Sequence, residues 1–137
     1  MLEKYALWKV IEVLVKGEEE YSVRQMSRTA GIGAGTAKAC LDYMHENGII
    51  KKKVIGNIYQ YSLDLANPAA RQIKNAYFAK ELLQKAGPKT WICSNEKEVV
   101  VVTTMESLKI EGIRIIKTNE HDFESLKKSY LDIITIR

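Results

Sequence analysis

The chain has 137 residues, of which 46% are hydrophobic and 28% are charged, and its net charge is +4 at pH 7. This composition is typical of a globular protein and excludes disordered, collagen-like and membrane-spanning classes. No apolar run approaches the roughly 18 to 20 residues that a membrane span needs, and the N-terminus lacks the layout of a signal peptide. We therefore expect a cytoplasmic protein with no membrane association.

Positive charge is not concentrated in the first half of the chain. Residues 1–65 contain nine Lys or Arg and eight Asp or Glu, a balance of +1, whereas residues 66–137 contain twelve and nine, a balance of +3. A basic protein can bind a polyanion, but the first half could do so only through charge that is concentrated locally.

Hydrophobic periodicity predicts two helices at the start of the chain. Over residues 3–16, apolar side chains recur every three or four positions, which is the spacing of one buried helical face. Ser22 and Gln25 form a capping-box pattern, in which each side chain satisfies a backbone N–H group of the other. This pattern predicts a second helix over residues 23–30.

A third helix and a β-hairpin follow. Residues 31–35 form a glycine-rich turn, helical spacing resumes over residues 36–47, and Asn47-Gly48 ends this helix with a left-handed cap. Residues 51–55 and 58–63 are β-prone and are joined by the turn residues Gly56-Asn57, so we expect a hairpin.

These elements resemble the winged helix-turn-helix domains of prokaryotic transcription regulators. Residues 21–32 resemble the second helix and turn of that family, residues 33–41 resemble its recognition helix, and Asn47-Gly48-Ile49-Ile50 resembles its exit into the wing. The resemblance covers about residues 4–64. It implies that residues 1–65 are a DNA-binding domain.

The resemblance also implies which side chains contact duplex DNA. Thr36 and Lys38 would face base edges or phosphates, and Ala39 could lie against a thymine methyl group. The second helix would bind the DNA backbone, and its N-terminus could present N–H groups to a phosphate. The expected DNA-binding residues are Ser22, Arg24, Gln25, Arg28, Thr36, Lys38, Ala39, Tyr43, Lys51, Lys53 and Asn57.

Lys51, Lys52 and Lys53 are the densest positive cluster in the chain. Alternation along a strand places Lys51 and Lys53 on one face and Lys52 on the other, so the three cannot all bind one row of phosphates. The turn at Gly56-Asn57 is short and carries no Arg, which argues against deep reading of the minor groove. Alternatively, the lysines are a solvated strand edge that guards against aggregation. Arg24 and Arg28 could likewise only solubilise their helix.

The second half begins with a helix that has two apolar stripes. Asn67-Pro68 is a typical helix start, and we expect the helix to run to residue 86, before Gly87-Pro88. One stripe is Ile73, Ala76, Tyr77, Leu83 and Ala86, and the other is Phe78 and Leu82. Two stripes exceed what a small domain can cover, so we expect one of them to contact a second copy of the chain.

Short strands and one more helix make the remainder a small α/β domain. The expected strands are residues 91–93, 99–102, 113–116 and 133–136, with a helix over residues 122–131 and a helical turn or loop at 105–109. The continuous apolar run at 99–102 predicts a strand that is covered on both faces.

The sequence contains no recognisable catalytic or metal-binding arrangement. His45 and His121 are not spaced as metal ligands. Cys40 and Cys93 are far apart in the sequence and neither belongs to a metal-binding or redox pair. We expect both cysteines to be buried, because a free cysteine usually lies in the interior. The glycine-rich stretch at 31–35 lies between two helices rather than after a strand, which excludes a nucleotide-binding fingerprint. We therefore expect no enzyme activity, no cofactor and no metal.

Together these features predict an α+β fold in three parts: a winged helix-turn-helix domain (1–65), a connecting helix with a possible dimer contact (66–88), and a small α/β domain (89–137). The leading hypothesis is a homodimeric transcription regulator that binds double-stranded DNA. A protein-interaction module, such as an antitoxin or an accessory subunit of a partner enzyme, is the alternative, because the first half is nearly neutral. An enzyme with its site in residues 89–137 is a third, less favoured hypothesis.

Overall fold

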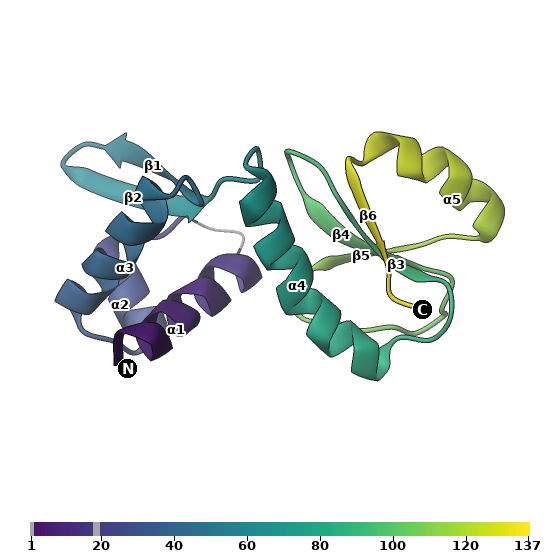
Figure 1. Ribbon diagram of the computed structural model, residues 1–137, viewed down its shortest axis with the longest axis horizontal. Helices are drawn as coiled ribbons and strands as arrows, with labels where there is room; N and C mark the ends of the chain where they lie inside the picture. The colour runs from purple at the N-terminus through teal and green to yellow at the C-terminus, as the bar shows by residue number, and fades with distance from the viewer. Residues whose placement is uncertain (1, 18–19) are drawn as a thin grey trace. The chain divides into compact units, whose positions relative to one another are not determined.

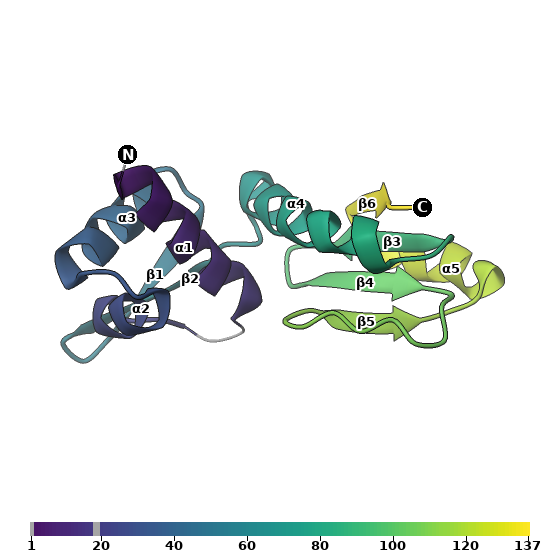
Figure 2. The same ribbon diagram turned by 90° about the horizontal axis from the view of Figure 1, so that it is seen from below.

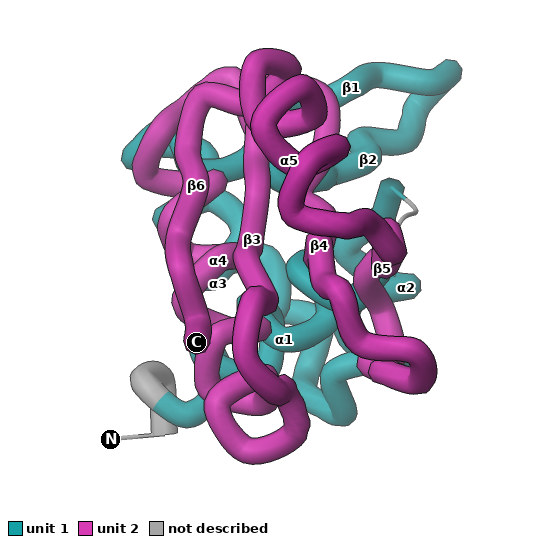
Figure 3. The backbone as a smooth tube through the Cα atoms, turned by 90° about the vertical axis from the view of Figure 1, so that its right-hand side faces the viewer, with its two compact units in different colours: residues 1–64 teal, residues 65–137 magenta. Residues whose placement is uncertain are grey.

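The computed structural model describes residues 2–17 and 20–137, and the chain divides into two compact units. Unit 1 comprises residues 1–64 and unit 2 comprises residues 65–137, as Figure 3 shows in two colours. The fold is mixed α+β, as the sequence predicts, with five α-helices and two sheets in the described residues. None of the helices within 2–17 and 20–137 is long and apolar enough to cross a membrane.

Unit 1 consists of three helices and a hairpin (Figure 1), as predicted. Its elements are α1 (Leu2–Lys16), α2 (Val23–Ala30), α3 (Ala34–Glu46), β1 (Ile50–Ile55) and β2 (Ile58–Leu63). Each element contributes to one core, which includes Val10 of α1, Met26 of α2, Leu41 of α3, Ile50 of β1 and Tyr61 of β2. Burial of this shared apolar surface holds the elements together, because none of them is long enough to be stable alone.

The caps of α2 form as predicted. The backbone N–H of Gln25 donates to Ser22 Oγ at 3.1 Å, and the backbone N–H of Ser22 donates to Gln25 Oε1 at 2.9 Å, which completes the capping box. Gly31 ends the helix in the left-handed conformation, with φ 69°, and its N–H bonds to the Ser27 carbonyl. The start of α3 differs from the prediction: Gly33 is its N-cap, so Ala34 and Gly35 belong to the helix rather than to the turn.

Two glycine substitutions in unit 1 should change stability in opposite directions. Gly31→Ala should lower the free energy of unfolding by about 1 kcal/mol, because an L-residue at φ 69° is strained. Gly35→Ala should raise it by about 0.5 kcal/mol, because Gly35 lies in a helix and an added Cβ meets no atom within 4 Å. Urea unfolding followed by Trp8 fluorescence, in a Trp91→Phe background, would measure both. Equal signs for the two variants would contradict this assignment.

The hairpin is joined to the helices by a contact that the sequence analysis missed. Tyr21, just before α2, pairs with Tyr61 of β2 through two backbone hydrogen bonds of 2.8 and 2.7 Å. The Tyr61 side chain is buried in the core of the unit. These contacts fix the position of the base of the hairpin, whereas its turn projects away from the helices (Figure 1).

Unit 2 is a four-stranded sheet with a helix on each face (Figure 2). The strand order is β5-β4-β3-β6, and only β4 and β5 run parallel. The elements are α4 (Pro68–Lys85), β3 (Thr90–Ser94), β4 (Val99–Thr103), β5 (Arg114–Lys117), α5 (Glu120–Leu126), a 3₁₀ turn (Lys127–Ser129) and β6 (Asp132–Thr135). All five residues of β4 are buried, which confirms that this strand is covered on both faces.

Two details of unit 2 differ from the prediction, in α5 and in α4. The helix expected over residues 122–131 begins at Glu120, where Asn119 caps it, and ends at Leu126. Residues 105–109 form a loop, which is one of the two alternatives that the sequence left open. The apolar stripe of Phe78 and Leu82 is buried on the inner face of α4. The same helix also buries the polar side chains of Arg71 and Asn75, which the sequence analysis did not expect.

The second stripe of α4 is less free than expected. Ala86 is buried, Ile73 and Tyr77 are half-buried, and only Ala76 and Leu83 are exposed. A small alanine and one leucine are a limited apolar surface for a dimer contact. The homodimer stays a prediction, with less support from this helix than the sequence pattern indicated.

Candidate nucleic-acid interface

Helix α3 has one buried side and one exposed side. Ala37, Cys40, Leu41 and Met44 face the core. The expected DNA-binding residues of this helix, Thr36, Lys38, Ala39 and Tyr43, are all exposed. The hydrophobic spacing that predicted the core side therefore also identified the exposed side.

Lys38 is not a free positive charge. Its ammonium lies 2.6 Å from Asp42 Oδ2, one helical turn further on. The hydrogen bond and the negative charge of Asp42 raise the pKa of Lys38. A phosphate that binds Lys38 must compete with this carboxylate, so the contribution of Lys38 to DNA binding is smaller than that of an unpaired lysine.

The expected DNA-binding residues in α2 and at its N-cap have two different roles. Ser22 and Gln25 are bonded to each other's backbone in the capping box, so they fix the start of the helix. Because Ser22 Oγ already accepts an N–H of the first turn, fewer N–H groups are free for a phosphate. Arg24 and Arg28 are exposed, and within residues 2–17 and 20–137 neither forms an ion pair. These two arginines are the free cations of the helix.

The lysines of β1 differ in their surroundings. The register pairs Lys52 with Tyr61, whose side chain points to the core, so Lys51 and Lys53 lie on the opposite face, as predicted. Lys52 Nζ lies 4.2 Å above the ring of Tyr59, which is cation–π geometry. Lys53 Nζ lies 4.0 Å from Glu20 Oε1. Lys51 has no ionic partner in the described part of the chain.

The tip of the hairpin is apolar, which the sequence analysis did not identify. We define the hairpin tip as Val54, Ile55, Ile58 and Tyr59, whose side chains are 48 to 62% exposed. Asn57 lies in the turn between them and is exposed. The sequence already indicated this exposure, because apolar residues occupy successive positions on both strands. Successive side chains of a strand point to opposite faces, so only one of each two can face the core.

Neither cysteine has the properties of a nucleophile. Both are buried, as predicted, and burial raises the pKa of the Cys40 thiol and raises that of the Cys93 thiol to about 11. The thiolate that reacts or binds a metal is therefore scarce at neutral pH. Among the residues that the structure describes, no three His, Cys, Asp or Glu side chains are grouped so as to hold a metal ion.

Unit 2 contains an open cleft of about 490 Å³ between α4 and the segment that leads into β5. Its apolar lining includes Leu108, Ile110 and Ile113. Glu81 and Lys85 at its rim pair with each other at 2.9 Å. The other titratable side chains of the lining are those of Lys109 and Glu111.

Comparison with known proteins shows no family for this chain. No protein-family model matches it, and no curated protein matches it significantly in sequence. The solved structure of human N-acetylserotonin methyltransferase in complex with SAM matches at 14% identity and a TM-score of 0.40, over 65% of this chain. The structure of HmgR from Pseudomonas aeruginosa matches at 12% identity and a TM-score of 0.43, over 96% of this chain and 67% of HmgR. This chain spans 32% of the methyltransferase.

Proposed function

We propose that this protein is a DNA-binding transcription regulator of the cytoplasm, which binds duplex DNA as a homodimer through a winged helix-turn-helix domain in residues 1–65. The observation that carries the proposal is that one side of α3 is exposed, while the rest of the helix contacts α1, α2 and β1. Two of these elements carry exposed cations, Arg24 and Arg28 on α2 and Lys51 and Lys53 on β1. A helix that enters the major groove needs such cations beside it to bind the phosphates.

The exposed side of α3 is also shaped for close approach. Gly35 and Ala39 are exposed and small, and an added Cβ on Gly35 would meet no neighbouring atom. A nucleic-acid backbone or base edge could therefore lie close to the first turns of the helix. Thr36 on the same turn supplies a hydroxyl group that can donate to or accept from a base or a phosphate.

Electrostatics in this proposal depends on three residues. Lys38 and Lys53 are near carboxylates, whereas Arg24, Arg28 and Lys51 have no acidic partner among the described residues. A phosphate that binds an unpaired cation does not have to displace a carboxylate of the protein. These three side chains should therefore neutralise most of the contacted phosphates and cause most of the release of counterions from the DNA.

The combined variant Arg24→Ala, Arg28→Ala and Lys51→Ala tests the proposal. Each lost phosphate contact lowers the magnitude of the slope of log affinity against log salt by about 0.9, so the slope should fall by about three for each bound protomer, or about five for the homodimer. Fluorescence anisotropy with a labelled duplex at several salt concentrations would measure it. The matched control replaces Lys80, Lys97 and Lys128, three exposed lysines of unit 2, and should leave the slope unchanged. Equal slopes for both variants, or no duplex binding by the parent at low salt, would contradict the proposal.

A protein-interaction module, for example an antitoxin or an accessory subunit, is the second candidate. The exposed hairpin tip favours it, because contiguous exposed apolar side chains often mark a protein interface. Stable co-purification with a partner, together with no retardation of duplex DNA at low salt, would favour this candidate over the first.

A further inference from the structure

We infer that the hairpin tip inserts between stacked base pairs from the minor groove of duplex DNA and bends the duplex. This inference rests on the proposed DNA-binding function and adds a mechanical role to it. Its starting observation is that four large apolar side chains lie at the projecting turn of the hairpin, each of them about half exposed or more.

The hairpin tip is apolar on both of its faces. The register pairs Val54 with Tyr59 and Ile55 with Ile58, so one apolar pair lies on each face of the ribbon. The core of unit 1 takes up Ile50 and Tyr61 from the base of the hairpin, but it does not cover the tip. Packing within unit 1 therefore does not explain why the tip is apolar.

Strand ends that are exposed to water usually carry charged or polar side chains, because apolar ones promote aggregation. An apolar pair on each face is suited to a binding site that contacts the ribbon from two sides. The space between two separated base pairs is such a site, since it has an apolar surface above and below.

The charges behind the tip favour DNA as the occupant. Lys51, Lys52 and Lys53 directly precede the tip on β1, and residues 50–63 contain no Asp or Glu. From outside the hairpin, the carboxylate of Glu20 lies 4.0 Å from Lys53 Nζ. Lys51 and Lys53 lie on one face of the hairpin and Lys52 lies on the other. Two phosphate rows border the minor groove, one on each side, so lysines on opposite faces can each bind one row. The same alternation that prevents all three from binding one row is suited to two rows.

The turn of the hairpin is short. Only two residues, Gly56 and Asn57, join the strands, and Gly56 has φ 61° while Asn57 does not adopt a positive φ. This is the pattern of a type II′ turn, which keeps the two strands close together. A tip without Arg does not read the minor groove by hydrogen bonds, but apolar side chains that separate a base step need no such donor.

The experiment combines bending with affinity. The parent and the Ile55→Ser/Ile58→Ser variant would be mixed with a mixed-sequence duplex of about 30 base pairs that carries a fluorophore at each end. Energy transfer between the ends reports bending, and anisotropy reports affinity. The parent should increase the transfer, and it should bind about tenfold more tightly when the duplex contains a mismatch, because unstacking a mismatched step costs less. The variant should lose both effects and keep the salt slope of the parent.

Two controls separate the outcomes. Leu83→Ser removes an equally exposed apolar side chain from unit 2 and should leave bending unchanged. Circular dichroism should show that the tip variant stays folded, since neither isoleucine belongs to the core. If the parent binds DNA with the expected salt slope but does not bend it, the inference fails and the proposed function stands. If the parent binds no duplex, both fail. Binding of the tip to anionic phospholipid vesicles, with unchanged DNA bending in the variant, would also overturn the inference.

Discussion

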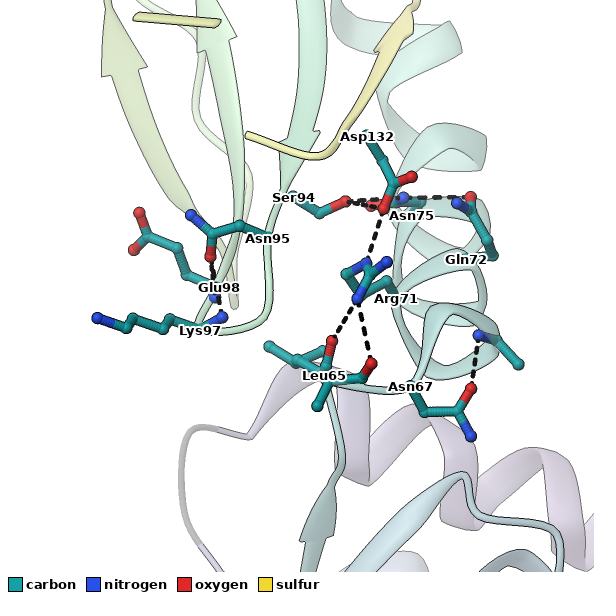
Figure 4. A network of polar contacts seen from close by, with 12 residues as sticks. Leu65, Asn67, Arg71, Gln72, Asn75, Ser94, Asn95, Lys97, Glu98 and Asp132 are labelled. Carbon is teal, nitrogen blue, oxygen red and sulfur yellow. Dashed lines mark hydrogen bonds and ion pairs between the residues drawn. The ribbon is translucent and has the colours of Figure 1, made fainter. Parts of the chain in front are cut away.

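Replacement of Arg71 by methionine should lower the melting temperature of unit 2 by roughly 12 to 24 °C. Arg71 is only 6% exposed, and its Nε donates to Asp132 Oδ2 at 2.7 Å, while its Nη1 donates to the Leu65 carbonyl at 2.8 Å (Figure 4). Loss of one partner of a fully buried ion pair typically costs 3 to 5 kcal/mol, and we expect the low end of about 3 kcal/mol here, because the Asp132 side chain is 25% exposed and keeps some contact with water. In a domain of this size, each kcal/mol shifts the melting temperature by about 4 to 8 °C.

The polar groups around Arg71 have few other partners. Ser94 Oγ donates to Asp132 Oδ2 at 3.3 Å, and Asn75 Nδ2 donates to Ser94 Oγ at the same distance. Asn75 is fully buried, and its Oδ1 atom has no hydrogen-bond partner in the described structure. After loss of the guanidinium, Ser94 Oγ is the one side-chain donor to Asp132 among these groups.

Arg114→Met is the matched control for Arg71→Met. Arg114 also pairs with a carboxylate, that of Glu98 at 2.9 and 3.1 Å, but Arg114 is exposed and Glu98 is only half-buried. An exposed pair contributes about 1 kcal/mol or less, so the control should shift the transition by at most about 4 to 8 °C. Trp91 is in unit 2, and a Trp8→Phe background makes its fluorescence report that unit alone. Equal shifts for the two variants would show that Arg71 does not stabilise unit 2 as a buried partner.

Local patterns predicted the elements of both units but not the contacts between distant residues. The helices, their caps and the hairpin follow from spacing and cap residues, which are local features of the chain. Arg71 is missed because charged residues are expected outside, and its partner Asp132 is 61 positions further on. The backbone pairing of Tyr21 with Tyr61 is an isolated bridge between two single residues. It therefore leaves no repeating pattern in the sequence from which it could be predicted.

The candidate interface shows the same division. Exposure of Thr36, Ala39 and Tyr43 follows from the helical period, since the opposite side is apolar. Which cations are free does not follow from the period. Lys38 and Asp42 are four positions apart on one helix and could have been paired from spacing alone, but the approach of Glu20 to Lys53 depends on how the hairpin packs.

Replacement of Phe78 by alanine is the second variant with a large expected effect. Phe78 is fully buried on the inner face of α4, with its ring edge-to-face against Tyr77 at a centroid distance of 5.3 Å. Deletion of a buried phenylalanine ring removes its apolar burial and leaves a cavity, which typically costs 3 to 5 kcal/mol. Since small domains are often stable by only about 5 kcal/mol, unit 2 should be unfolded in a large fraction of molecules near body temperature. Thermal unfolding followed by Trp91 fluorescence would measure this.

Leu83→Ala on the same helix is the control, because Leu83 is 50% exposed and its truncation should change stability by about 0.5 kcal/mol or less. The Phe78→Ala variant also separates the two units, since α4 belongs to unit 2 while Trp8 lies in unit 1. In a Trp91→Phe background, the Trp8 transition should keep its midpoint while the far-ultraviolet dichroism of unit 2 is lost. A parallel fall of the Trp8 transition would show that unit 1 depends on unit 2 for its stability. Retained Trp8 folding with weakened duplex binding would instead place the dimer contact of the proposed regulator in residues 65–137.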